Sequence, residues 1–271
     1  MSHKAKAPTD RHWNKTGIGA LILAVVVIVG AAGIAATRAD QPLPTVTKAP
    51  ITAQNPREML VIGDSYTEGT PLGGEGDKNW TQLALRQLRR EGVDITATVS
   101  AAGGSGYVTR GLSGTVFGQA LQSAISADGG SEAPEDIVLI FGGTNDQIAP
   151  RDTEAVAVRD VLKSARARAP RAKLIVVGPV WPDSEPSPAV LQIRDIVRAE
   201  AARAGATFVD PIADRWFSAE PQLIGDDGVH PTDMGHVYMS ERLLPVIRSE
   251  LTRAQQEREA AAEQPVRAGG R

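Results

Sequence analysis

Short runs of apolar residues alternate along this chain with longer segments of helical period, and that alternation limits its fold more than any other feature. The run at 174–177, Leu-Ile-Val-Val, is apolar at every position, which is typical of parallel strands buried on both faces. The pattern predicts an α/β protein, a three-layer α/β/α sandwich around a five-stranded parallel sheet. We expect strands at 58–63, 94–100, 136–141, 172–178 and 206–210, and helices near 79–91, 115–127, 152–169, 187–204 and 233–249.

An apolar span lies near the N-terminus. Residues 18–36 carry no charge, and ~20 apolar residues are enough to cross a bilayer. The preceding segment, 1–17, contains four Lys or Arg and one Asp, so the positive-inside bias predicts a cytoplasmic N-terminus and an extracytoplasmic remainder. The alternative is a cleaved signal peptide, whose apolar region is normally only ~7–15 residues long, and the small-residue site at 37–39 is poor. We therefore favour an uncleaved transmembrane signal anchor.

The rest of the chain divides into three parts. Residues 37–56 contain four prolines and few apolar side chains, which predicts an extended linker. Residues 57–250 form the single predicted domain, with approximate bounds. Residues 251–271 are rich in Ala, Glu, Gln and Arg, and we expect a frayed helix followed by a flexible tail.

Composition excludes several classes of protein. The net charge is −3 and the charges are interspersed, so no basic stripe suggests a nucleic-acid partner. The chain has no cysteine, which excludes disulfides, thiolate zinc sites and a cysteine nucleophile. It also lacks a His-Glu-x-x-His motif and a Walker A loop, so we expect neither a metal nor a cofactor.

Three polar signatures suggest a catalytic site. They are Gly-Asp-Ser at 63–65, Gly-Thr-Asn-Asp at 143–146 and Asp-Gly-Val-His at 227–230. The first two directly follow predicted strands, and ligands in such folds bind at the carboxyl ends of the strands. A serine is a poor nucleophile until a base takes its proton and a carboxylate orients that base. We predict Ser65 as the nucleophile, His230 as the base and Asp227 as the carboxylate.

In this order the signatures resemble the blocks of the SGNH, or GDSL-type, hydrolase family, named for a Ser, a Gly, an Asn and a His in separate blocks. The resemblance covers roughly residues 57 to 250 and implies the flavodoxin-like fold of that family. It also implies an oxyanion hole made by the backbone N–H of Ser65, the N–H of a second-block glycine and the side-chain amide of Asn145. The best match for that glycine is Gly106, with Gly104 as the alternative.

These residues together predict a membrane-anchored, extracytoplasmic serine esterase. The expected substrate is an ester or an O-acetylated or acylated glycan. One alternative is an O-acyltransferase that uses the same three residues on a cell-envelope glycan. A second alternative is a non-catalytic glycan-binding module, although a binding module has no need for Ser65, Asp227 and His230 together.

Overall fold

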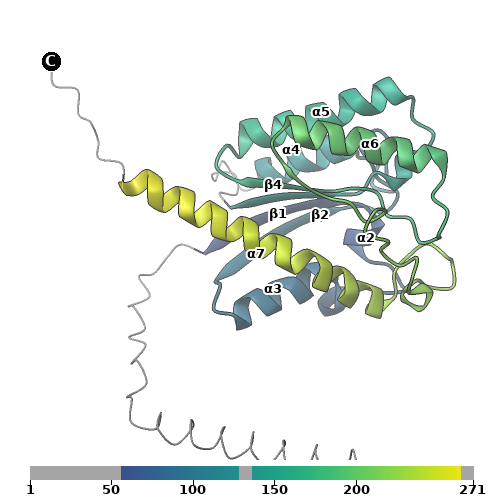
Figure 1. Ribbon diagram of the computed structural model, residues 1–271, viewed down its shortest axis with the longest axis horizontal. Coiled ribbons are helices and arrows are strands. Elements are labelled where there is room, and N and C mark those ends of the chain that lie inside the picture. The colour runs from purple at the N-terminus through teal and green to yellow at the C-terminus, as the bar shows by residue number, and fades with distance from the viewer. Residues whose placement is uncertain (1–55, 128–135, 264–271) are drawn as a thin grey trace, which may run out of the picture. The chain divides into compact units, whose positions relative to one another are not determined.

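Five parallel strands form the middle layer of an α/β/α sandwich (Figure 1). The computed structural model describes residues 56–127 and 136–263. The sheet order is β2-β1-β3-β4-β5, and every neighbouring pair is parallel, which confirms the predicted fold. The strands are β1 (Arg57–Gly63), β2 (Ile95–Ala101), β3 (Ile137–Phe141), β4 (Lys173–Val177) and β5 (Thr207–Val209).

The apolar strand sequences follow from the two cores that they separate. Successive side chains on a strand point to opposite faces, so Val61 packs into one core and Ile62 into the other. On the Val61 side lie α3 (Trp80–Arg90) and α7 (Asp233–Glu263). The opposite face is covered by α4 (Phe117–Ala127), α5 (Arg151–Arg168) and α6 (Pro188–Arg203) (Figure 1).

The last helix corrects one prediction. We expected this helix near 233–249 and, over 251–271, a frayed helix followed by a flexible tail, but α7 runs without a break from Asp233 to Glu263 and Pro245 lies inside it. The reason is tertiary, because Leu251 and Ala254 are buried. Beyond them, side chains of α7 bind residues at the starts of β1, β3 and β4: Gln255 with Arg57, Arg258 with Asp136, and Glu257 with Lys173.

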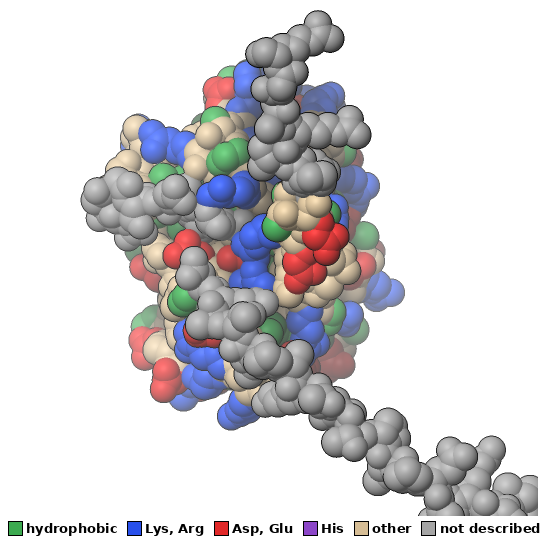
Figure 2. Space-filling model, turned by 90° about the vertical axis from the view of Figure 1, so that its left-hand side faces the viewer, with side chains coloured by type: hydrophobic (Ala, Val, Ile, Leu, Met, Phe, Trp, Pro, Cys, Tyr) green, Lys and Arg blue, Asp and Glu red, His purple; other side chains and the backbone are tan. Residues whose placement is uncertain are grey.

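Surface charges are mixed, as the sequence predicts. Figure 2 shows Lys and Arg side chains intermingled with Asp and Glu on the face turned to the viewer. Across residues 56–127 and 136–263, no helix combines the length and the apolar character that a membrane crossing requires. The predicted span at 18–36 and its flanking segments lie outside the described residues.

Candidate active site

The nucleophile candidate lies at the carboxyl end of a central strand. β1 ends at Gly63, and the four-residue helix α2 (Ser65–Glu68) begins two residues later. Asp64 caps this helix, because its Oδ1 accepts the N–H of Tyr66 at 3.0 Å. Ser65 is therefore the first helical residue, and its own N–H has no partner within the helix.

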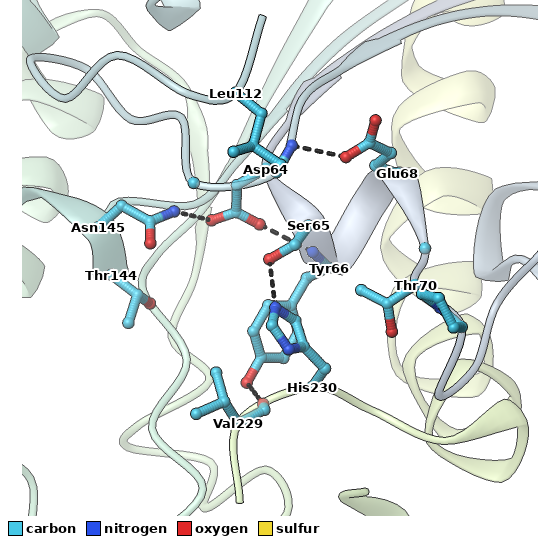
Figure 3. A pocket seen from close by; sticks show the side chains of 14 residues that line it. Asp64, Ser65, Tyr66, Glu68, Thr70, Leu112, Thr144, Asn145, Val229 and His230 are labelled. Atoms are coloured by element: carbon cyan, nitrogen blue, oxygen red, sulfur yellow. Dashed lines mark hydrogen bonds between the residues drawn. The ribbon is translucent and has the colours of Figure 1, made fainter. Parts of the chain in front are cut away.

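Ser65, His230 and Asp227 lie in one continuous chain of hydrogen bonds. His230 Nε2 is 3.0 Å from Ser65 Oγ (Figure 3). His230 Nδ1 is 2.6 Å from Asp227 Oδ2. With Nδ1 donating to the carboxylate, Nε2 is free to accept the serine proton, which is the arrangement that general-base catalysis needs.

The loop that carries Asp227 and His230 is held by backbone and side-chain hydrogen bonds. Asp227 Oδ1 accepts the N–H of Val229 and that of His230, both at 2.9 Å. The Tyr66 hydroxyl donates to the carbonyl of Val229 at 2.5 Å (Figure 3). The hydrogen bond from the His230 side chain is the main cause that lowers the pKa of Asp227 to about 2, so this carboxyl group stays ionised at neutral pH.

The second block differs from the expectation. Gly106 is buried and its N–H donates to the carbonyl of Thr109 at 2.9 Å, so this N–H does not face a substrate. A Cβ at Gly106 would lie 2.3 Å from an oxygen of Asp146, which explains the glycine by packing. Gly104 is exposed and lines the same pocket as Ser65, and its N–H has no hydrogen-bond partner among the described residues. Gly104, the alternative in the sequence, thus replaces Gly106 as the candidate oxyanion donor.

Asn145 follows β3 and points toward Asp64 (Figure 3). Its Nδ2 donates to the carbonyl of Ser105 at 2.9 Å and lies 3.4 Å from Asp64 Oδ2. Because an amide nitrogen carries two hydrogens, one is held by Ser105 and the other makes only a long contact. Burial raises the pKa of Asp64 to about 7, and the carboxylate of Asp146 adds to the rise.

A pocket of about 460 Å³ opens over these groups. Ser65, His230 and Asn145 line it. Apolar side chains form part of its wall, namely Pro71, Leu112 and Val229. The arrangement places the candidate nucleophile and the candidate base beside a space large enough for a small ester.

Sequence reasoning missed two residues of this site. Glu68 lines the pocket and its Oε2 accepts the N–H of Gly103 at 2.6 Å, while Tyr66 binds the histidine loop. Both belong to α2, one and three residues after Ser65. Both residues could have been predicted from the sequence, because they closely follow Ser65 in the segment that forms α2.

Known proteins resemble this chain in sequence and in fold. The model of the GDSL-like lipase/acylhydrolase family matches residues 61–238. A GDSL lipase of Mycobacterium tuberculosis is 46% identical over 196 residues, which are 71% of this chain and 82% of that protein. A lipase/acylhydrolase from Enterococcus faecalis shares the fold with a TM-score of 0.57 and 16% identity, over 71% of this chain and 96% of that one. An acetylxylan esterase from Geobacillus stearothermophilus has a TM-score of 0.54 and 19% identity, over 70% and 94%.

The fold and the sequence relationship define a serine hydrolase that acts on esters. The chain belongs to the GDSL-like lipase/acylhydrolase family, the SGNH hydrolases.

Proposed function

We propose that this protein is a membrane-anchored, extracytoplasmic serine esterase whose catalytic triad is Ser65, His230 and Asp227. The main support for this triad is the 3.0 Å contact between Ser65 Oγ and His230 Nε2, which lies beside an open pocket. The oxyanion hole consists of the N–H of Ser65, the N–H of Gly104 and the Asn145 Nδ2 hydrogen that is not bound to the Ser105 carbonyl.

Each group has one chemical task. Ser65 Oγ bonds to the ester carbonyl carbon while His230 Nε2 takes the hydroxyl proton, and the oxyanion hole stabilises the negative oxygen that forms. His230 then gives the proton to the leaving alcohol oxygen as the C–O bond breaks, which leaves an acyl group on Ser65. Water attacks this acyl group, again with His230 as base, and the carboxylic acid and free Ser65 are released. Asp227 orients the imidazole and stabilises its charged form.

The proposed substrate is a neutral acyl or acetyl ester, with O-acylated glycans as the preferred class. The apolar wall formed by Pro71, Leu112 and Val229 suits the hydrocarbon part of an acyl group. A relative with the same fold is an acetylxylan esterase by name, which supports an acetylated sugar as the alcohol side.

A substrate panel tests this function. Full-length protein in mild detergent is assayed on p-nitrophenyl esters of graded chain length and on acetylated xylooligosaccharides, with and without an unacylated sugar as acceptor. We expect hydrolysis of short esters and release of acetate at rates that do not depend on the acceptor. A product that forms only with the acceptor contradicts the esterase and supports an O-acyltransferase. Sugar binding without turnover supports a binding module instead.

The membrane part of the proposal rests on residues 18–36, which carry no charge and follow a basic segment. We expect full-length protein to sediment with membranes, to resist extraction by alkaline carbonate and to dissolve in detergent. External protease on intact cells should release the domain through the linker at 37–56. Mass spectrometry that finds a mature N-terminus near residue 40 contradicts the anchor and indicates a cleaved signal peptide. Protection of an intact chain from protease contradicts the extracytoplasmic orientation.

A further inference from the structure

The glycine turn beside the nucleophile is held from two sides at Gly103. Its N–H donates to Glu68 Oε2 at 2.6 Å (Figure 3). Its carbonyl accepts the N–H of Leu112 at 2.9 Å. Gly103 therefore has both backbone polar groups occupied, one by a side chain of α2 and the other by the neighbouring loop.

These two hydrogen bonds determine where the next N–H points. In a trans peptide the C=O and the following N–H point in opposite directions. Because the Gly103 carbonyl is directed at Leu112, the N–H of Gly104 is directed away from that loop. Gly104 has a φ of 74°, a conformation that glycine adopts without strain. Gly104 also lines the pocket, so a ligand in the pocket can reach its N–H. In the same turn, the N–H of Ser105 and that of Gly106 are bound to backbone carbonyls.

Glu68 lies in the same four-residue helix as Ser65. It is the last residue of α2, and Ser65 is the first. A Cβ on Gly103 would lie 3.1 Å from Glu68 Oε2 and 3.9 Å from Ser65 Cβ, so the turn packs closely against this helix.

We propose that Glu68 is a positioning residue that holds the turn 103–104 so that the Gly104 N–H faces the oxyanion beside Ser65. The proposal rests on the proposed esterase function for its catalytic consequence. Glu68 touches neither the substrate nor the reacting atoms in this role. It acts through the backbone of Gly103 and limits how far the Gly104 donor moves between substrate binding and the transition state.

Three substitutions separate the hydrogen bond from the charge. Glu68→Ala removes both. Glu68→Gln keeps an acceptor oxygen at the same reach but removes the charge, whereas Glu68→Asp keeps the charge on a side chain one methylene shorter. Glu75→Ala is the matched control, because Glu75 is an exposed acid whose side chain caps nothing.

The main readout is the division between kcat and KM on p-nitrophenyl acetate. We expect Glu68→Ala and Glu68→Asp to lower kcat by about 10- to 100-fold, since a misplaced oxyanion donor weakens transition-state binding, and to change KM by less than about 3-fold. Glu68→Gln should stay within about 3-fold of wild type, as should the control. The affinity for a trifluoromethyl ketone, which forms an oxyanion on the serine, should fall by the same factor as kcat.

Amide hydrogen exchange tests the same contact without substrate. Exchange at Gly103 should be faster than wild type in the alanine and aspartate variants and unchanged in the glutamine variant. Unchanged kcat and unchanged exchange in Glu68→Ala overturn the inference, and so does a glutamine variant as impaired as the alanine variant, which would make the charge decisive. If the wild type hydrolyses no ester, the proposed function fails while the exchange data still decide whether Glu68 holds the turn.

Discussion

Replacing Ser65 by alanine is expected to lower kcat for ester hydrolysis by about 10⁶-fold, the loss typical of removing a triad nucleophile. The side chain of Ser65 has His230 Nε2 as its hydrogen-bond partner, so the substitution removes one contact. The free energy of unfolding should therefore change by no more than about 1 kcal/mol. Steady-state kinetics on p-nitrophenyl acetate, with a thermal unfolding midpoint for each protein, measure both effects.

The matched control is Ser113→Ala, since Ser113 is an exposed serine whose hydroxyl contacts Thr115. It should retain the wild-type kcat. A serine-directed organophosphonate should modify the wild type at Ser65 alone, as read by peptide mass spectrometry. Substantial activity in Ser65→Ala, or an adduct on Ser105 or Ser113, would assign the nucleophile elsewhere.

Replacing Asp227 by asparagine is expected to lower kcat by about 10⁴-fold, the effect of leaving a triad histidine in the wrong tautomer. Asp227 Oδ1 accepts two backbone N–H groups, which should hold the amide oxygen of an asparagine in that place. The amide NH₂ then faces His230 Nδ1 and obliges it to act as an acceptor. The imidazole proton moves to Nε2, where it points at Ser65 and prevents proton abstraction.

The adjacent residue provides the control for charge. Asp226→Asn removes the same charge one position away, and no hydrogen bond joins the side chain of Asp226 to the triad. We expect Asp226→Asn to remain within about 3-fold of wild type, because exposed charges interact weakly through water. Equal losses in the two variants would contradict an orienting role for Asp227. NMR of the imidazole nitrogens in each variant would report the tautomer directly.

Much of the fold could be predicted from the sequence because buried strands are made of apolar residues. The strand β3 is apolar at all five positions, and all five are buried in the sheet. The edge strand β2 carries Thr and Ser and is largely exposed or half-buried, so its apolar signal is weaker. Its position in the sheet follows from the pairing with β1, which no local pattern specifies.

The end of α7 could not be predicted from the sequence in the same way. The segment after residue 251 has the composition of a frayed helix, rich in Ala, Glu, Gln and Arg. Its helical state depends on partners distant in the sequence, such as Asp136, which binds Arg258 at a separation of 122 residues. Local propensity says little about a helix that tertiary contacts stabilise.

The sequence by itself determined the residue types of the proposed site and their order. A serine and an asparagine that directly follow apolar strands meet at one edge of a parallel sheet, because the carboxyl ends of the strands all lie there. The three-residue spacing of Asp227 and His230 likewise allows one short loop to join acid and base. These features depend on local chain geometry and on the direction of the strands.

Only the tertiary structure showed which of two glycine N–H groups in the second block lacks a hydrogen-bond partner among the described residues. Gly104 and Gly106 are equivalent as residue types, and both lie in one glycine-rich run. The N–H of Gly106 is occupied by Thr109, whereas the N–H of Gly104 is left free by the turn that Glu68 holds. The hydrogen bonds of this loop join residues distant in the sequence, such as Glu68 and Gly103. The spacing of residues in the sequence therefore does not predict which glycine N–H stays without a partner.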